Sequence, residues 1–491
     1  MNLQEFDIHN SHLKGSFSDL DPHLRRLQNQ PLIYRFPLID RLPRNQPGIY
    51  TIGGGRQIGK TTLLKQWMAE RLLAGTAPNH IRFLTGELID DHHTLVRLVS
   101  TLCEDMPTNS TRYILLDEVT YIADWDKGIK YLADAGLLED VVLIATGSDM
   151  VVIQEARMRF PGRRGQAATV DFHLQPLSFA ESLHLKRGMS IEELEKLAYA
   201  DLSQQNETEQ MLREEFMAYL IHGGFLTAIN DMALHGRILP ATLATYSDWI
   251  RGDILKRGKQ EHYLREVLQA IVRCYGTQTT WNALARDLSI DHPTTVSDYS
   301  ALLVSMDVVF IQKALREDKL TGAPKKARKI AFCDPFIFHA VQSWLHHTQD
   351  PFSEQVRPAL EDPERTGLLV EACTAAHYGR HYPTYYIKSE GEVDIAYIKG
   401  DRFWPVEIKW TGQLRPKTLK QIGKYTNGCI LARQSRPSKI AEIPVQLLPL
   451  ALLRLDMADR AARAEDGTLR KILDKVPDRE PLPGDELENH S

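Results

Sequence analysis

The sequence is poor in cysteine, in long apolar runs and in net charge. Its five cysteines lie far apart and form no C-x-x-C pair, which argues against a zinc ribbon or a disulfide scaffold and favours a reducing compartment. No apolar run is long enough to cross a bilayer, and the N-terminus lacks the charged and apolar segments of a signal peptide. We therefore expect a cytoplasmic protein without a membrane partner.

The charge balance excludes a uniformly basic protein. Net charge is −5 at pH 7, so any contact with nucleic acid must use a local basic patch. A composition that is 43% hydrophobic and 25% charged is typical of a globular chain. Its 491 residues are enough for several domains, since one domain takes about 150 residues.

A glycine-rich stretch is the strongest motif. Residues 54–61 read GGRQIGKT and fit the pattern G-x-x-x-x-G-K-[ST]. An apolar segment before it predicts a strand, and residues 63–70 predict a helix after it. The N–H groups of such a loop, at the positive end of a helix, bind phosphate. The predicted ATP-binding residues are Gly54, Gly55, Arg56, Gln57, Ile58, Gly59, Lys60, Thr61 and Thr62.

Two acids at the end of another apolar strand complete the predicted nucleotide site. Asp117 and Glu118 follow the run RYILL, at the strand end where α/β sheets bind ligands. We expect Asp117 and Thr61 to hold Mg²⁺ and Glu118 to polarise the attacking water. Lys60 would reach the β- and γ-phosphates. The sequence therefore predicts an ATPase with ATP and Mg²⁺ as cofactors.

Polar residues after a third buried strand are candidates for sensing the γ-phosphate. The segment 141–148 reads VVLIATGS, and Thr146 and Ser148 either sense the phosphate or satisfy a turn. Arg163 and Arg164 follow on a glycine-bounded loop. A guanidinium there could stabilise transition-state charge in its own or a neighbouring subunit, which would make a homo-oligomer a partner; the alternative is a solvated basic loop.

These segments together resemble prokaryotic AAA-type ATPases fused to a C-terminal domain with a nuclease-like fold. The resemblance rests on GGGRQIGKTTLL, LLDE, ATGS and GRR followed by LQPLSFAE, and it covers about residues 30–453. It implies an α/β P-loop NTPase core, a helical lid, a winged-helix middle and a C-terminal α/β restriction-endonuclease-like domain. One departure is GGFL at 223–226, where the family commonly has a proline after the aromatic residue.

The predicted domain boundaries follow from these motifs and from shifts in pattern. They are an N-terminal arm (1–45), the ATPase core (46–177), a helical lid (178–260), a winged-helix-like domain (261–345), a nuclease-like domain (346–455) and a charged, disordered tail (456–491). The helix predicted at 294–306 carries no lysine or arginine, which favours a spacer or docking role over base reading. A basic run at 325–329 is expected on a solvated strand edge, with phosphate contact as the alternative.

The C-terminal part carries a second group of chemically active residue types. Asp394, and then Glu407 and Lys409 on the next predicted strand, resemble the PD-(D/E)XK nuclease pattern. Strand alternation turns Glu407 and Lys409 to the same face. The resemblance implies that Asp394 and Glu407 bind Mg²⁺, that Lys409 activates the attacking water and that Glu371 adds a ligand from a helix.

Three interpretations of function stay open. The first is an ATPase coupled to a domain that binds DNA and cuts it, supported by the Q-x-x-x-Y pattern of Gln421 and Tyr425 on one expected helix face, as in RecB-like nucleases. The second is a nucleotide-driven switch whose nuclease-like domain binds DNA or a protein without cutting, its charged residues forming a salt-bridge network. The third is a signalling or defence ATPase of the STAND type.

Overall fold

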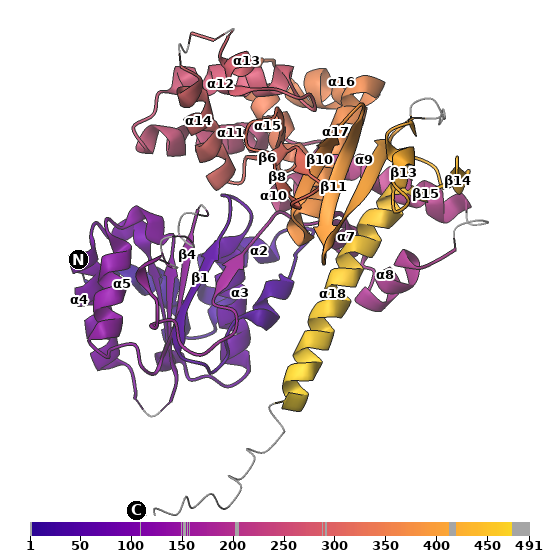
Figure 1. The fold of residues 1–491 in the computed structure, drawn as a ribbon. Helices are drawn as coiled ribbons and strands as arrows, with labels where there is room; N and C mark the ends of the chain where they lie inside the picture. Colours follow the sequence, from indigo (N-terminus) through magenta and orange to yellow (C-terminus); the bar gives the residue numbers. More distant parts are fainter. Residues whose placement is uncertain are drawn as a thin grey trace, which may run out of the picture.

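The computed structural model describes residues 2–473, apart from 109, 149, 151–153, 155, 157, 202–205, 287, 290–291 and 412–418, and describes only the backbone of 461–473. An N-terminal α/β domain lies below a helical middle part, and a C-terminal sheet packs beside the long helix α18 (Figure 1). Among the described helices, none combines the length and apolarity that a bilayer span requires.

The N-terminal domain is built on a five-stranded parallel sheet of order β2-β3-β4-β1-β5. Its strands are β1 (Gly48–Gly53), β2 (Ile81–Thr85), β3 (Arg112–Asp117), β4 (Val141–Gly147) and β5 (Asp171–His173). Strand β4 lies between β1, which leads into the glycine-rich loop, and β3, which ends in the acid pair. The α/β P-loop fold of this part is confirmed.

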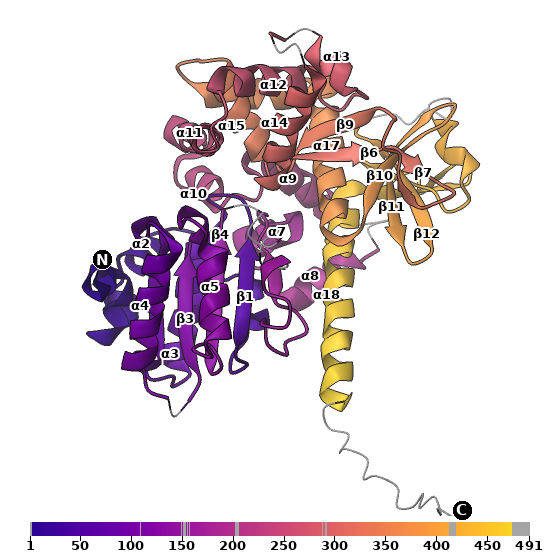
Figure 2. The same ribbon diagram turned by 60° about the vertical axis from the view of Figure 1, so that its left-hand side comes forward.

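Helices cover both faces of this sheet (Figure 2). Helix α3 (Lys60–Leu73) packs on one face, and α4 (His92–Asp105) and α5 (Trp125–Asp134) pack on the other. Every residue of β1, β3 and β4 is buried as a result. A strand buried on both faces needs a continuous apolar run, which is why these strands were predictable.

The N-terminal arm protects the edge of the sheet. Its first helix, η1 (Leu3–Leu13), lies along the edge strand β2. Asn10 Nδ2 donates to Phe83 O at 2.8 Å, and Phe83 N–H donates to Asn10 Oδ1 at 2.8 Å. The amide side chain thus replaces a neighbouring strand at an otherwise open edge. Helices α1 (Phe17–Leu20) and α2 (Pro22–Gln28) then lead back towards α3.

The segment expected to be a helical lid is helical in its described part, but only half of it lies near the nucleotide loop. Its helices are α7 (Phe179–Arg187), α8 (Ile191–Ala198), α9 (Asn206–His222), α10 (Leu226–His235) and α11 (Pro240–Lys256). Helices α7–α9 share an apolar cluster with α18 and the C-terminal sheet, where Phe216 meets Trp410 with ring centroids 5.2 Å apart. The lid prediction is therefore wrong for α7–α9, because their apolar faces are occupied there.

The middle part places three helices before a two-stranded antiparallel ribbon. The helices are α12 (Glu261–Arg273), α13 (Trp281–Ala285) and α14 (Pro293–Ser305); the ribbon pairs β6 (Val309–Lys313) with β9 (Arg328–Phe332), and α15 (Pro335–Leu345) follows. The short strands β7 (Leu315–Arg316) and β8 (Thr321–Gly322) lie at the ribbon tip. This order agrees with the expected helices and hairpin, and the winged-helix assignment itself stays a prediction.

The C-terminal domain is a mixed six-stranded sheet of order β10-β11-β12-β13-β15-β14. Strands β10 (Thr384–Lys388), β11 (Glu392–Lys399) and β12 (Arg402–Lys409) are antiparallel, and β12, β13 (Cys429–Ala432) and β15 (Ile443–Leu447) are parallel. Strand β14 (Lys439–Ile440) closes the edge. Helix α17 (Pro363–His381) packs on this sheet, preceded by η6 (Phe352–Val356) and α16 (Arg357–Glu361).

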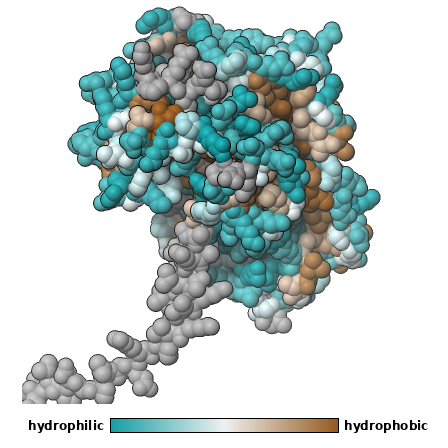
Figure 3. All heavy atoms as spheres, turned by 90° about the vertical axis from the view of Figure 1, so that its right-hand side faces the viewer, coloured by the Kyte–Doolittle hydropathy of each residue, from teal (hydrophilic) through white to brown (hydrophobic). Residues whose placement is uncertain are grey.

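The tail expected to be disordered from residue 456 is helical up to residue 473. Helix α18 spans Leu448–Leu473, and residues 474–491 lie outside the described part. Leu452 and Leu453 are fully buried, and the buried Asp456 accepts from His381 Nε2 at 2.9 Å. The apolar residues that anchor this helix lie mainly before residue 456, so the charged composition of the tail did not indicate that the helix continues. Hydrophilic side chains cover most of the face in Figure 3, between narrower apolar strips.

The unusual GGFL turn joins three parts of the chain. A Cβ at Gly223, where φ is +55°, would lie 1.6 Å from Asp334 Oδ1. Gly224 N–H donates to Asp334 Oδ2 at 2.8 Å, and Leu177 N–H donates to Gly224 O at 2.9 Å. Close backbone approach at two glycines, rather than a proline, therefore fixes this turn.

Candidate functional site

The glycine-rich loop connects β1 to the first turn of α3. A Cβ at Gly54 would lie 2.3 Å from Leu174 O, and one at Gly59, where φ is +100°, would lie 2.6 Å from Phe36 Cζ. Only glycine fits at both positions. Because α3 begins at Lys60, the loop lies at the positive end of a 14-residue helix, as anion binding requires.

Lys60 is buried and folds back over the loop. Its Nζ donates to Gly54 O at 3.1 Å and to Gly55 O at 2.9 Å, and it lies 3.4 Å from Glu118 Oε1. The ammonium group is therefore held between the loop and the acid-bearing strand, within reach of a phosphate lying in the cradle.

Asp117 lies at the centre of a hydrogen-bonded group. Thr61 Oγ1 donates to Asp117 Oδ2 at 2.6 Å, and Thr146 Oγ1 donates to Asp117 Oδ1 at 2.6 Å. Glu118 N–H donates to Thr146 Oγ1 at 3.0 Å. Burial, together with the adjacent Glu118, raises the pKa of Asp117. A divalent cation held by Asp117 and Thr61 would offset this cost, so the donor set fits magnesium.

Glu118 adopts a strained backbone conformation. Its φ and ψ are +55° and +49°, the left-handed region that few non-glycine residues occupy. Its buried Oε2 has no hydrogen-bond partner among the described residues. Such outliers persist where the surrounding structure fixes them, often at functional sites.

A cavity of about 720 Å³ opens beside these residues, within the size range of small-molecule sites. Predicted residues that line it include Arg56, Gln57, Gly59, Lys60, Thr61, Thr62, Asp117 and Glu118. The N-terminal arm supplies further lining residues that the sequence motifs did not indicate, among them His9, His23 and Arg26. His23 Nε2 lies 2.9 Å from Thr62 Oγ1. The arm therefore forms one wall of the candidate nucleotide site.

Two contacts that the sequence did not reveal tie the loop to other domains. Arg56 pairs with Asp253 Oδ1 of α11 at 2.9 Å and donates to Tyr121 OH at 2.6 Å. Gly55 N–H donates to Asp307 Oδ2 of the middle part at 3.2 Å, and His173 Nε2 lies 2.8 Å from the same oxygen. No local motif marks Asp253 or Asp307, because both lie about 200 residues or more from the loop in sequence.

The remaining nucleotide-site candidates do not line the cavity themselves. Ser148 Oγ is 3.4 Å from Thr120 Oγ1, whereas Thr146 contacts both acids, so the structure brings only Thr146 to the site. Arg163 pairs with Asp134 on α5. Arg164 is largely buried against β1, where it donates to Thr51 Oγ1 at 3.0 Å and to Ile49 O at 3.3 Å. The expectation that these arginines serve the nucleotide of their own subunit is wrong, because their partners are on other parts of the domain.

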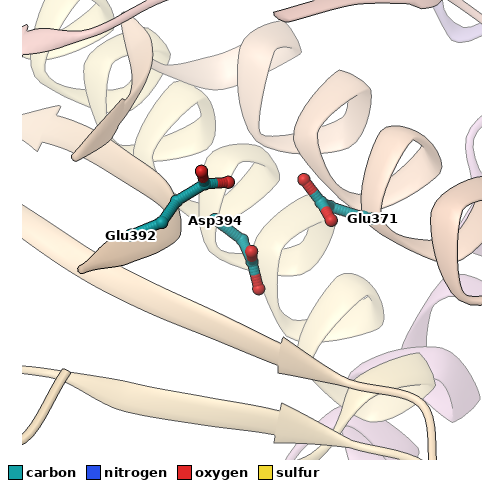
Figure 4. A group of neighbouring side chains, drawn as sticks. All are labelled: Glu371, Glu392 and Asp394. Carbon is teal, nitrogen blue, oxygen red and sulfur yellow. The ribbon is translucent and has the colours of Figure 1, made fainter. Parts of the chain in front are cut away.

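The C-terminal candidates form an acidic cluster. Glu371 of α17 and Glu392 and Asp394 of β11 point toward one another (Figure 4). One carboxylate oxygen of each lies within 4.8 Å of the others. Glu392 was missed in the sequence, although strand alternation places it on the same face as Asp394. Three carboxylates at this spacing could hold a hard divalent cation.

Glu407 and Lys409 join this cluster from β12. Ile408 N–H donates to Asp394 Oδ2 at 2.8 Å, and Lys409 Nζ donates to Glu407 Oε1 at 2.5 Å. Glu407 is 5% exposed, and its Oε2 has no hydrogen-bond partner among the described residues. Burial and the neighbouring Asp394 raise the pKa of Glu407 to about 7. The structure thus brings the four predicted residues of this second site together.

Lys329 enters the cluster from the middle part. Its Nζ donates to Glu371 Oε1 at 2.6 Å and also pairs with Glu392. Burial alone would lower the pKa of Lys329, but the carboxylates of Glu371 and Asp394 outweigh it and raise the pKa. The expectation of a solvated edge is therefore wrong for Lys329, whose side chain is 4% exposed.

The expected helix around Gln421 is a single short turn, η8 (Ile422–Lys424), where Gln421 Nε2 still lies 3.4 Å from Tyr425 OH.

Comparison with known proteins assigns two segments. Residues 46–183 match the model of the AAA domain family, and residues 213–348 match a family described as a domain of unknown function. No curated protein matches this chain.

Several solved structures are similar to parts of this chain, all at low identity. A Walker-type ATPase of Pyrococcus abyssi is 14% identical, with a TM-score of 0.38 over 60% of this chain and 91% of that one. The ORC1 protein of Aeropyrum pernix, solved in complex with DNA, is 12% identical, with a TM-score of 0.29 over 65% and 90%. Cdc6p of Pyrobaculum aerophilum is 14% identical, with a TM-score of 0.24 over 70% and 96%.

These scores are too low to carry an argument, so the assignment rests on the family match and on the site itself. The matched segment holds the glycine-rich loop, the acid pair and Thr146 around one cavity. The chain therefore contains an AAA-type P-loop ATPase domain at residues 46–183.

Proposed function

We propose that this chain is a magnesium-dependent ATPase whose nucleotide state is coupled to a C-terminal, PD-(D/E)XK-like domain that meets DNA. The observation that carries the first half is the group of Thr61, Asp117, Thr146 and Glu118 beside Lys60. Lys60 and the loop N–H groups bind the phosphates, and Asp117 and Thr61 hold the cation. Bound magnesium would neutralise phosphate charge during hydrolysis.

Glu118 is proposed to orient and polarise the attacking water. Its fixed backbone suits that role, and so does its Oε2, which has no hydrogen-bond partner in the part of the chain that the structure describes. Thr146 positions Glu118 and Asp117 relative to one another. Ser148, and Arg163 acting on a neighbouring subunit, remain predictions.

Variants of Glu118 and Lys60 test this half. Glu118→Gln should lower kcat about 100-fold or more while ATP still binds, because one general-base contribution is typically 10²–10⁴-fold. Lys60→Ala should lose ATP binding, and chelation of magnesium should stop turnover. Glu139→Gln, at an exposed position that does not line the cavity, serves as the matched control. Unchanged ATP affinity in Lys60→Ala would contradict the proposal.

The second half rests on Asp394, Glu407 and Lys409 beside Glu371. Adjacent strands and a helix bring these groups together, and their oxygen-rich donor set fits magnesium. Lys409 would orient the water that attacks a phosphodiester, and the carboxylates would hold the cation. We propose nuclease activity on this basis, with the β10–β12 sheet as its scaffold.

A plasmid-nicking assay with ATP and Mg²⁺ or Mn²⁺ tests this activity. The wild-type chain should nick supercoiled DNA, and Lys409→Ala should not. Lys399→Ala, an exposed lysine of β11, is the control and should behave as wild type. Equal nicking by wild type and Lys409→Ala would show that the cut arises elsewhere.

A second candidate function is a nucleotide-driven switch, including a STAND-type signalling ATPase, whose C-terminal domain binds without cutting. The observation that favours it is Lys329, whose ammonium group lies among the acids of the cluster. This candidate predicts no nicking in any metal, together with DNA or protein binding that changes with ATP.

A further inference from the structure

The ammonium group of Lys329 lies among carboxylates, where a bound metal ion would lie, and not on the protein surface. Its Nζ contacts Glu371 and Glu392, two of the three acids whose oxygens converge in Figure 4. Gln278 donates to the other oxygen of Glu392. A lysine ammonium cannot share this space with a divalent ion that uses the same oxygens. In this conformation, Lys329 therefore takes the place such an ion would need.

The charge of the cluster leaves room for more positive charge than the lysines supply. Four carboxylates, Glu371, Glu392, Asp394 and Glu407, face two ammonium groups, Lys329 and Lys409. Four negative and two positive charges leave a formal −2 when all are ionised. The buried Oε2 of Glu407, which has no hydrogen-bond partner among the residues that the structure describes, is a second, independent sign of an unused ligand position. Withdrawal of Lys329 would change the formal charge of the cluster from −2 to −3 and would free two carboxylate oxygens.

Lys329 also belongs to an element that reaches the nucleotide loop. On the β6–β9 ribbon, Lys329 lies opposite Gln312, whose Nε2 donates to Asp394 O and to Tyr385 O, each at 2.9 Å. Asp307, two residues before β6, accepts from Gly55 N–H of the loop. Through Asp307, just before its first strand, the ribbon thus connects the candidate nucleotide site to the acidic cluster that Lys329 contacts.

We propose that Lys329 is a tethered cation that blocks divalent-metal binding at the acidic cluster, and that nucleotide binding withdraws it through the β6–β9 ribbon. The cluster is then a metal site under nucleotide control, with Glu392 as a further ligand. This inference rests on the proposed function of the same cluster and adds its regulation. The metal is identified only by its chemistry, a hard divalent cation with oxygen ligands.

Manganese binding to the full-length chain tests the block, with Mn²⁺ alone as the probe and electron paramagnetic resonance as the readout. Lys329→Met keeps the length of the side chain and removes its charge, and it should bind Mn²⁺ at least tenfold more tightly than wild type. Lys326→Met, an exposed lysine of the same basic run, should not. Adding Glu392→Gln to Lys329→Met should abolish the gain. Equal affinity in wild type and Lys329→Met would overturn the block.

Amine labelling of the wild-type chain, read by mass spectrometry, tests the control by nucleotide and does not depend on the folding of any Lys329 variant. Lys329 should be protected without nucleotide and label several-fold faster with a non-hydrolysable ATP analogue, while Lys326 labels equally in both states. The increase should vanish in Asp307→Ala. Labelling of Lys329 that is indifferent to nucleotide overturns the coupling. Tight Mn²⁺ binding by Lys329→Met without nicking would instead reject the nuclease activity and leave this inference standing.

Discussion

Thr146 joins both acids of the nucleotide site. Its hydroxyl donates to Asp117 and accepts from the Glu118 N–H group. Thr146→Val keeps the shape of the side chain and leaves both partners, the buried Asp117 and the part-buried Glu118 N–H, without that hydrogen bond, at about 1–3 kcal/mol each. We expect kcat for ATP hydrolysis to fall roughly 10–100-fold. Thr146→Ser should retain most activity in the same steady-state assay, and a valine variant with wild-type kcat would refute this role.

His381 gives the chain a measurable pH dependence. Burial alone would lower its pKa, but Asp456 and Asp459 of α18 raise it to about 9. Because the folded pKa lies above the unfolded value of about 6.5, this pair stabilises fully below pH 6.5 and loses its effect as pH rises through 9.

The prediction is made on unfolding free energy. The free energy of unfolding of the wild type minus that of His381→Gln should be about 3 kcal/mol larger at pH 6 than at pH 10, since one pKa unit corresponds to about 1.4 kcal/mol. Urea denaturation at the two pH values measures this difference. His347→Gln, at an exposed position, should show no such change. The same result for both histidines would contradict the assignment.

At the residue scale, the sequence predicted what a short motif can encode. Lys60, Thr61, Asp117 and Glu118 lie on one continuous loop or at one strand end, so spacing alone identifies them. Lys329 escaped prediction because its partner Glu371 is 42 residues away, and its basic neighbours suggested a solvated edge. Pairing across domains leaves no local pattern.

The first helix of the arm takes the place of a neighbouring strand at the open edge of β2. Asn10 makes two hydrogen bonds to Phe83, both buried. Asn10→Ala should lower the free energy of unfolding by about 2–3 kcal/mol, because it leaves a strand N–H and a carbonyl unpaired. Chemical denaturation measures the loss. Asn79→Ala, an exposed residue just before β2, should stay within about 0.5 kcal/mol of wild type.

Among the elements, burial decided which were predictable. The strands β1, β3 and β4 are buried throughout and mostly apolar, so their positions follow from composition. The predicted disordered tail begins inside helix α18, because the chain turns charged after Asp456, although that acid is itself paired and buried. Helices α7–α9 were predicted correctly as helices, but amphipathicity alone did not tell which domain their apolar faces would meet.

The Arg56–Asp253 pair connects the nucleotide loop to α11 and so belongs to the molecule as a whole. Its side chains are 24% and 8% exposed. Arg56→Ala and Asp253→Ala should each weaken ATP binding, and the double variant should be little worse than either, with a coupling of about 1–2 kcal/mol. Titration calorimetry measures the four affinities.

The exposed Arg237–Asp350 pair supplies a matched cycle. Its side chains are 44% and 33% exposed, so its coupling in the same titration should be close to zero. Strictly additive effects for Arg56 and Asp253 would mean that the two residues affect ATP affinity independently, and that α11 is not coupled to the nucleotide loop through this pair.

A close contact among three parts of the chain limits how chimeras can be built from this protein. It involves Leu177, Gly223, Gly224 and Asp334. These positions come from the end of the ATPase core, the α9–α10 turn and the start of α15, and they fit with no space for a methyl group at either glycine. A swap of the ATPase core onto a foreign effector would separate them. An ATPase segment that is transferred to another protein must therefore extend past residue 334, and chimeras in which it ends at residue 183 should misassemble at this contact.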